Sequence, residues 1–335
     1  MGYTSSMKYD ILALGDTVVD AFIRLKDARV TCDINNENCM ISMRFGDKIP
    51  FEFAEVIYGV GNSANAAVAC ARLGINTGLR TYVGNDDDGA RCVTALEKNG
   101  VHTELVVKQD GKITNYHYVL WFESERTILI KHEQFDYAMP ELTEEPTWIY
   151  LSSMADGTLP YHQQLGKYLI DHPNVKVAFQ PGTFQMKMGT EALADIYGRT
   201  EIFFCNKEES QRILKTETHD IKELLNGLAA LGPKLVVITD GREGSYARER
   251  DGQMWHAPMY PDPKPPLERT GAGDASASTC VAYLHKGMNL EESLLRGQIN
   301  SASVVQEIGA QKGLLNADQI EEWYSKRPAD FKATP

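Results

Sequence analysis

The sequence predicts an α/β protein with a central, mainly parallel sheet, because its strand-like segments are short and apolar and because they alternate with helix-like segments. From residue 148 onward, short apolar runs that suit strands alternate with helix-like segments. This alternation is typical of a parallel sheet that helices cover on both faces. The chain has 335 residues, of which 43% are hydrophobic and 24% are charged, as in an ordinary globular protein. An α/β fold of this length commonly forms one domain, so we expect a single domain.

The first third of the chain is expected to begin with two strand–helix pairs. The apolar run at 9–14 predicts a buried strand. The small residues at 62–73 predict a helix, which a glycine ends. A second strand is predicted at 77–83 and a second helix at 87–98, again followed closely by a glycine.

Two strand-like segments interrupt this regular order. Residues 20–53 have mixed polarity and no clear helical period. Aromatic and apolar residues alternate with others over 114–122, and 126–131 follows across a charged turn, which predicts a hairpin. The proline-rich segment 261–266 predicts a stiff linker. The strands predicted between the hairpin and this linker are 148–151, 175–180, 202–205 and 235–239.

Composition excludes several classes of protein. The formal net charge of −12 argues against nonspecific binding of nucleic acid. We see no leader with a charged and then an apolar part and no long apolar run, so we expect neither export nor a membrane span. The cysteines are scattered without a C-x-x-C pair, so we expect reduced thiols, no zinc site and a cytoplasmic protein. They are Cys32, Cys39, Cys70, Cys92, Cys205 and Cys280.

The motif RTGAGDAS at 269–276 carries the strongest chemical signal. A helix-like run follows it, so the amides of Gly271, Ala272 and Gly273 lie at the positive end of a helix dipole. Such amides can hold a phosphate-like anion, and glycine lets the backbone approach it closely. Asp274 then lies where a carboxylate can take a proton from a nucleophile that attacks the anion. A simpler interpretation is an aspartate that only offsets the helix dipole.

RTGAGDA resembles the C-terminal signature of the ribokinase-like (PfkB) sugar and nucleoside kinases. Further segments resemble motifs of that family in the same order: GDTVVD at 15–20, VGNSANAAVACARLG at 60–74, NKEE at 206–209 and VVITDGREG at 236–244. The resemblance implies a ribokinase-like three-layer sandwich.

The resemblance also implies how the chain is divided. A single kinase domain would cover 8–330, and insertions at about 20–53 and 101–131 would form a small β lid over the acceptor site. These insertions could instead be ordinary surface hairpins. A lid excludes water, which would otherwise hydrolyse the phosphoryl donor. A homodimer formed through the lid is a further expectation.

Individual residues receive roles from the same resemblance. Asp274 would be the general base, and the amides of residues 271–273 would hold the transferred phosphoryl group. The expected acceptor-binding residues are Asp20, Gly61, Asn62 and Asn65. The expected nucleotide-binding residues are Asn206, Glu209, Thr239, Gly241, Gly244, Arg269 and Thr270, and Glu209 would hold Mg²⁺ indirectly through water. The implied activity is transfer of the γ-phosphoryl group of ATP to a hydroxymethyl group of a sugar, with Mg²⁺ as cofactor.

Some of these residues have simpler interpretations. Asp20 could be a solvated loop acid, and Asn206 with Glu209 could form only a capping box at a helix start. Gly59, Gly61 and the alanine three residues later imitate the G-x-G-x-x-A motif of dinucleotide-binding proteins. An NAD-dependent dehydrogenase is therefore a competing hypothesis, although this motif does not lie in the first βα unit.

The nature of the acceptor and the presence of turnover also admit competing hypotheses. A nucleoside kinase competes most closely with a sugar kinase, because the aromatic-rich segment 116–122 could stack on a base or simply pack the lid. A non-catalytic nucleotide- or sugar-binding protein is more remote, since the presence of Asp274 argues against it. The chain has no Walker A loop, so the phosphates of a nucleotide must be held in another way.

Two residues before the motif depart from the family pattern. Glu268 and Arg269 stand where the family usually has Asp and Thr, and the Asp position commonly joins a monovalent-cation site. The extra methylene of Glu268 shifts its oxygens, which puts K⁺ activation in doubt. Arg269 could replace the charge of the cation or clamp a phosphate, or it could point outward and pair with a surface acid such as Glu268.

Overall fold

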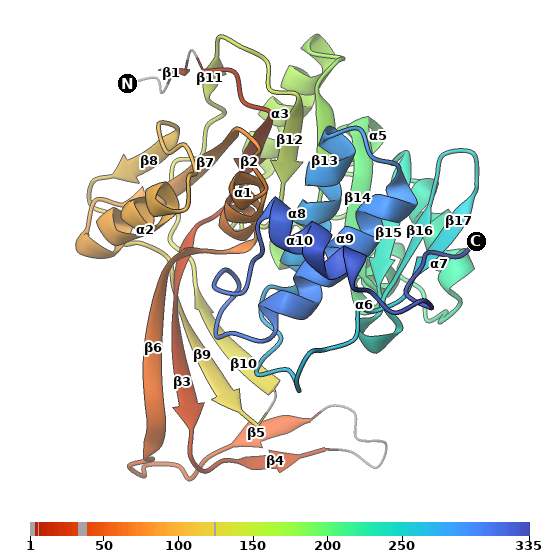
Figure 1. The fold of residues 1–335 in the computed structure, drawn as a ribbon. Helices are drawn as coiled ribbons and strands as arrows, with labels where there is room; N and C mark the ends of the chain where they lie inside the picture. The colour runs from red at the N-terminus through yellow and green to blue at the C-terminus, as the bar shows by residue number, and fades with distance from the viewer. Residues whose placement is uncertain (1–3, 6, 33–38, 124) are drawn as a thin grey trace.

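The computed structural model describes residues 4–5, 7–32, 39–123 and 125–335. In this part of the chain the largest sheet has nine strands, in the order β17-β16-β15-β14-β13-β12-β2-β7-β8 (Figure 1). The strands from β15 to β8 are parallel to one another, and β16 and β17 are antiparallel. The bounds are β2 Ile11–Leu14, β7 Thr77–Gly84, β8 Val106–Gln109, β12 Trp148–Leu151, β13 Lys176–Phe179, β14 Thr200–Asn206, β15 Leu235–Thr239, β16 Ser245–Arg248 and β17 Met254–Ala257.

Helices cover both faces of this sheet. One face packs against α1 (Asn62–Arg72), α8 (Ala272–His285), α9 (Leu290–Val304) and α10 (Ala317–Ser325). The other packs against α3 (Leu159–Asp171), α5 (Ala194–Arg199), α6 (Lys207–Leu214) and α7 (Ile221–Ala229). Successive residues of β2 alternate between these two cores, as the pleat of a doubly covered strand requires. The predicted α/β fold with a mainly parallel sheet is confirmed.

The remaining elements are short or lie at the margins. Helix α2 (Asp87–Lys98) packs beside β7 and against the strand β6 (Phe51–Val60). The other elements are α4 (Thr183–Met188), the 3₁₀ turn η1 (Gly241–Glu243), and a two-residue parallel pair of β1 (Thr4–Ser5) with β11 (Glu141–Leu142). No helix in the described ranges combines the length and the apolar character that crossing a bilayer requires.

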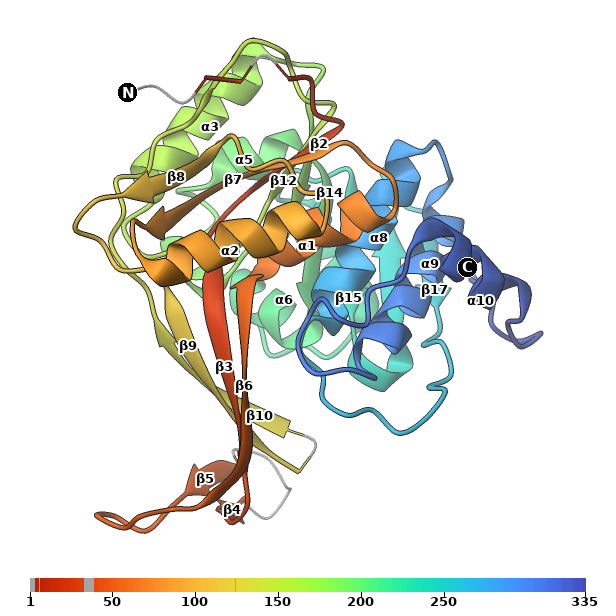
Figure 2. The ribbon, with the colours of Figure 1, turned by 60° about the vertical axis from the view of Figure 1, so that its left-hand side comes forward.

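A separate four-stranded sheet projects from the body, in the order β10-β9-β3-β6 (Figures 1 and 2). Its strands are β3 (Val18–Leu25), β6 (Phe51–Val60), β9 (Tyr116–Phe122) and β10 (Glu125–Lys131). We call this sheet the lid. The first insertion that forms the lid is longer than expected, because its last strand, β6, ends at residue 60 and not at about residue 53. The second insertion begins at β9, because β8 pairs with β7 of the main sheet and so belongs to the body.

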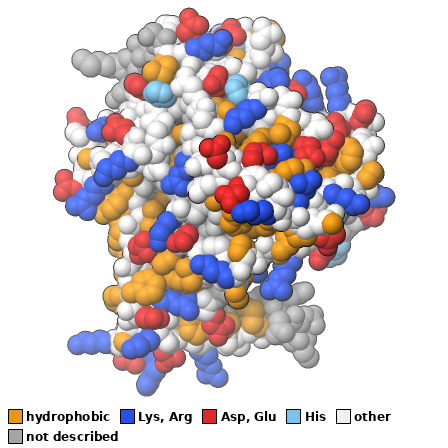
Figure 3. Space-filling view, viewed as in Figure 1, with side chains coloured by type: hydrophobic (Ala, Val, Ile, Leu, Met, Phe, Trp, Pro, Cys, Tyr) orange, Lys and Arg blue, Asp and Glu red, His pale blue; other side chains and the backbone are white. Residues whose placement is uncertain are grey.

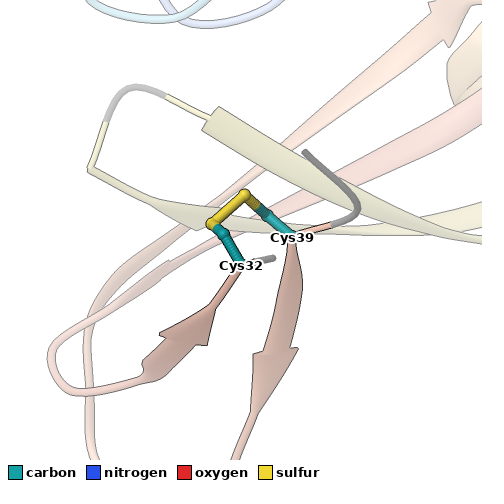
Figure 4. The surroundings of a disulfide bond; sticks show 2 residues. All are labelled: Cys32 and Cys39. Atoms are coloured by element: carbon teal, nitrogen blue, oxygen red, sulfur yellow. A yellow bond between two sulfur atoms is a disulfide. The ribbon is translucent and has the colours of Figure 1, made fainter. Parts of the chain in front are cut away.

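A small hairpin at the far end of the lid corrects the expectation that all cysteines are reduced. Strands β4 (Arg29–Thr31) and β5 (Met40–Ser42) pair antiparallel, with Thr31 opposite Met40. The residues just beyond this pair, Cys32 and Cys39, therefore face each other and form a disulfide (Figure 4). Their spacing along the chain gave no sign of this pairing. The other four cysteines are free and buried, and the prediction of a cytoplasmic protein loses part of its support.

Candidate active site

The predicted motifs meet at the carboxyl ends of the parallel strands. The chain runs from β2 outward to β7 and β8, and then returns to β12 beside β2 before continuing outward on the other side. Ligands of open α/β sheets bind at such a point, where the strand order reverses. A cavity of about 430 Å³ lies there, between the body and the lid. Its lining includes Asp20, Asn62, Asn65, His117, Arg126, His132, Gln180, Asn206, Glu209, Thr239, Arg269, Thr270, Gly273 and Asp274.

Three side-chain amides hold the carboxylate of Asp274. The Nδ2 atom of Asn62 donates to Oδ1 at 2.8 Å, and Nδ2 of Asn65 donates to Oδ2 at 2.8 Å. The Nε2 atom of Gln180, at the end of β13, donates to Oδ1 at 3.0 Å. Burial raises the pKa of Asp274, and these hydrogen bonds together with the charge of Arg126 act in the opposite direction. The result is an oriented carboxylate with a raised proton affinity, as a general base requires.

The turn before Asp274 has the shape of an anion site. Gly271 has φ +81° and precedes the first residue of α8. An added Cβ there would lie 2.5 Å from the Cα of Ala310, so glycine is needed for the close approach of two backbone segments. A Cβ at Gly273 would meet nothing within 4 Å, so the chain borders open space at this residue in the first turn of α8.

Two polar atoms beside this turn are buried without a hydrogen-bond partner. They are Nε of Arg269 and Oγ1 of Thr270, and both residues line the cavity. A phosphate at the start of α8 would offer acceptor oxygens to donors of these two kinds. The residues present therefore fit the phosphate group of a nucleotide.

Glu268 stabilises the backbone of the same turn through two hydrogen bonds. Its carboxylate accepts a hydrogen bond from the amide of Thr270 at 2.6 Å and another from the amide of Gly309 at 2.9 Å. The described residues contain no ion pair between Glu268 and Arg269, so the outward pairing considered for Arg269 is absent. Arg269 instead lies between the main cavity and a smaller one of about 100 Å³ that Gly241 also lines.

Asn206 and Glu209 form the capping box that begins α6. Oδ1 of Asn206 accepts from the amide of Glu209 at 2.7 Å, and Oε2 of Glu209 accepts from the amide of Asn206 at 2.8 Å. Burial raises the pKa of the Glu209 carboxyl. Both residues also line the cavity, next to Thr239 at the end of β15. Their oxygens suit Mg²⁺, a hard cation that prefers oxygen ligands and keeps several waters.

Two of the predicted site glycines also have a packing role. Gly244 has φ +87°, and a Cβ there would stand 2.2 Å from the carbonyl oxygen of Ala257. Gly61 lines the cavity, and a Cβ there would stand 2.8 Å from the carbonyl oxygen of Asp16. Gly59 lies near the end of β6 and Gly61 directly follows it, and β6 is an antiparallel strand of the lid, not a strand of the parallel sheet. The dinucleotide motif is thus out of its structural context, and the dehydrogenase hypothesis is wrong.

The lid contributes polar side chains that the sequence did not single out. Nδ1 of His117 lies 3.3 Å from Oδ1 of Asp20, and Nδ1 of His132 lies 3.2 Å from Oδ2 of Asp16. Oδ1 of Asp20 and Nε2 of His117 are buried without a hydrogen-bond partner. Asp20 therefore faces the cavity as predicted, and the solvated-loop interpretation fails because its exposure is only 8%.

Comparison with known proteins identifies the class. A model described as "pfkB family carbohydrate kinase" matches residues 52–317, so the chain belongs to the pfkB family of carbohydrate kinases. It is a sugar kinase, a phosphotransferase with an alcohol group as acceptor.

The relatives are distant and span most of the chain. Identity is 25% over 331 residues to an ATP-dependent 6-phosphofructokinase of Thermoanaerobacterium thermosaccharolyticum, covering 95% of this chain and 94% of the relative. Identity is 27% over 282 residues to a 5-dehydro-2-deoxygluconokinase of Bacillus subtilis, covering 79% and 86%. The solved structure of a nucleoside kinase of Methanocaldococcus jannaschii, an archaeal member of the ribokinase family, has a TM-score of 0.77 at 20% identity and covers 96% and 99%. This last likeness shows the fold.

Proposed function

We propose that the protein transfers the γ-phosphoryl group of ATP to a hydroxymethyl group of a sugar, with Asp274 as the general base. The observation that carries this proposal is the position of the Asp274 carboxylate. It is held by three amides in one cavity that has the start of α8 on one side and the lid residues Asp20 and His117 on another. A base between an anion site and a diol-binding carboxylate is the arrangement that phosphoryl transfer to an alcohol needs.

The phosphate end of the reaction belongs to the start of α8. The amides of Gly271, Ala272 and Gly273 hold the transferring group, and the orphaned donors of Arg269 and Thr270 bind its neighbours. The smaller cavity next to Arg269 and Gly241 extends this site for the rest of the nucleotide. Asn206 and Glu209 hold Mg²⁺ through water, and the ion neutralises phosphate charge.

The acceptor end belongs to the lid and to the start of α1. Asp20 accepts hydrogen bonds from adjacent hydroxyls of the sugar, because its carboxylate faces the cavity and its Oδ1 has, among the described residues, only the 3.3 Å contact with Nδ1 of His117 and no hydrogen bond. Asn65 and Asn62 hold Asp274 in the position where it removes the proton of the acceptor hydroxyl. The lid covers both ligands and keeps water from the phosphoryl group.

A sugar acceptor is favoured over a nucleoside by the direction of the aromatic side chains. In β9 it is His117 that lines the cavity, whereas Tyr118 is 49% exposed on the opposite face of the lid. The aromatic-rich strand therefore offers no stacked pair of rings toward the acceptor. A nucleoside acceptor is the second candidate, because the chain shares its fold with the nucleoside kinase of M. jannaschii.

A coupled assay of ADP release, run with a panel of sugars and nucleosides, tests the proposal. The variant Asp274→Asn should keep the fold and ATP binding and lose about 10²–10⁴-fold in kcat, the usual contribution of a general base. Asp318→Asn is the matched control, because Asp318 also lies in the first turn of a helix, α10, and is exposed outside the cavity. Near wild-type kcat in Asp274→Asn, or an equal loss in the control, would contradict the assignment.

A further inference from the structure

Two arginines flank one tryptophan in a single row of the lid. Arg24 of β3 lies opposite Trp121 of β9, and Trp121 lies opposite Arg126 of β10. Side chains opposite one another in neighbouring strands point to the same face of a sheet. Both guanidinium groups therefore start from the same row and the same face, yet their surroundings differ.

Arg24 has a full set of partners. Its guanidinium lies 4.2 Å from the centre of the Trp121 ring, and Nε lies 3.9 Å from Oε2 of Glu52. It also donates a hydrogen bond to the carbonyl oxygen of Glu123. The partners of Arg24 all lie within the lid, and Arg24 does not line the cavity.

Arg126 lines the cavity and lacks such partners. Its Nε is buried without a hydrogen bond, and no ion pair to Arg126 occurs in the described ranges. Its charge nevertheless acts on Asp274, since it is among the causes that lower the pKa of this carboxyl. Leaving this buried Nε without an acceptor is costly, so the geometry favours a ligand that brings an anionic group into the cavity.

The position of Arg126 along β10 indicates which ligand that is. The row that carries Asp20 and His117 continues to Ile130, four residues after Arg126. At about 3.3 Å per residue this places the two rows roughly 13 Å apart along the strand. Ile128 lies between them in the cavity wall. The guanidinium therefore reaches a part of the acceptor several atoms away from the hydroxyls that Asp20 binds.

We propose that the acceptor is an anionic sugar derivative and that Arg126 binds its carboxylate or phosphate group. This inference rests on the proposed function. A planar guanidinium binds either group through two parallel hydrogen bonds. The protein carries a formal net charge of −12, so an anionic acceptor needs a local cation to enter a cavity that already contains Asp20 and Asp274.

The test compares pairs of acceptors that differ only in charge: a hexose with the corresponding hexonate, and a hexose with the corresponding hexose phosphate. For at least one pair the wild type should prefer the anionic member in kcat/KM, and the two pairs distinguish carboxylate from phosphate. Arg126→Gln should reduce this preference by about 10- to 100-fold, mainly through KM, which corresponds to loss of a charge-assisted hydrogen bond. Arg126→Lys should restore part of the preference, because it returns the charge without the planar fork.

Arg24→Gln is the matched control, since it removes the same charge from the same row outside the cavity, and it should leave the preference unchanged. Equal use of neutral and anionic acceptors by the wild type would overturn the inference. It would also be overturned if Arg126→Gln lowered kcat for every acceptor and slowed ATP hydrolysis without acceptor, which would assign Arg126 to the phosphoryl group. Calorimetry with the same compounds separates the two proposals, because Arg126-dependent binding without phosphorylation would refute only the kinase function.

Discussion

Two glycines of the proposed anion-binding turn should respond to alanine in opposite ways. Gly271→Ala forces a non-glycine residue to φ +81° and brings a Cβ to 2.4 Å from the Cβ of Ala310. The left-handed conformation costs about 1–2 kcal/mol, and the clash costs about 1–3 kcal/mol. The expected loss of stability is therefore about 2–5 kcal/mol. With an unfolding entropy of about 2.1 cal/mol/K per residue, this lowers the Tm by roughly 3–7 °C.

Gly273→Ala should leave the fold intact and impair catalysis. Its Cβ would meet no protein atom within 4 Å, and alanine is favoured over glycine within a helix. The methyl group instead enters the space in which the amides meet the phosphoryl group. Alanine keeps the backbone N–H, but a methyl group that displaces the phosphoryl group from this donor should cost about 10²–10³-fold in kcat, as the loss of one such donor does. Scanning calorimetry and the ADP-release assay on both variants decide the matter, and a stable Gly271→Ala or a fully active Gly273→Ala would refute the reasoning.

Three further predictions concern pH, cations and assembly. Gln180→Leu removes a hydrogen bond that stabilises the Asp274 carboxylate, so the pKa of this carboxyl should rise further. The acid limb of the kcat/KM profile should then move to higher pH. An acid limb that stays in place or moves to lower pH would contradict the role of Gln180. Activity should require Mg²⁺ and depend only weakly on KCl at fixed ionic strength, and Arg269→Thr should raise the KM for ATP or lower kcat. Strong K⁺ activation together with an unchanged variant would refute this pair of expectations. Hydrophobic side chains gather over the region of the lid (Figure 3), and Val56, Tyr118 and Leu129 form one exposed row on the face of the lid that points away from the cavity. We expect a homodimer through this row, and light scattering should find Tyr118→Glu to be a monomer; a monomeric wild type would exclude the dimer.

The regular elements of the body were predicted well because their signals are local. Helix α2 and strands β12 and β15 have the predicted bounds. A buried strand needs only a short apolar run, and a helix needs only its period and its ends. The lid was located less well, since β8 resembles a lid strand in sequence and becomes part of the body only through its pairing with β7.

The sequence by itself determined the class of protein and supplied the candidate for the general base. The turn at 269–274 combines glycines, a helix start and an aspartate within six residues, and chain connectivity alone keeps such a device together. The capping box of Asn206 and Glu209 is local in the same way.

Only the tertiary structure decided which side chains surround that base. Asn62 and Gln180 reach Asp274 across 212 and 94 residues of sequence, and Gln180 carries no motif of its own. Strand pairing places Arg126 and Arg24 in one row of the lid, and they differ because Arg24 finds partners within the lid while Arg126 lines the cavity. Cys32 and Cys39 likewise meet because the pairing of β4 with β5 places them opposite each other. Such contacts depend on how separate elements pack against one another. A local sequence pattern therefore does not indicate which distant residue will become the partner of a given side chain.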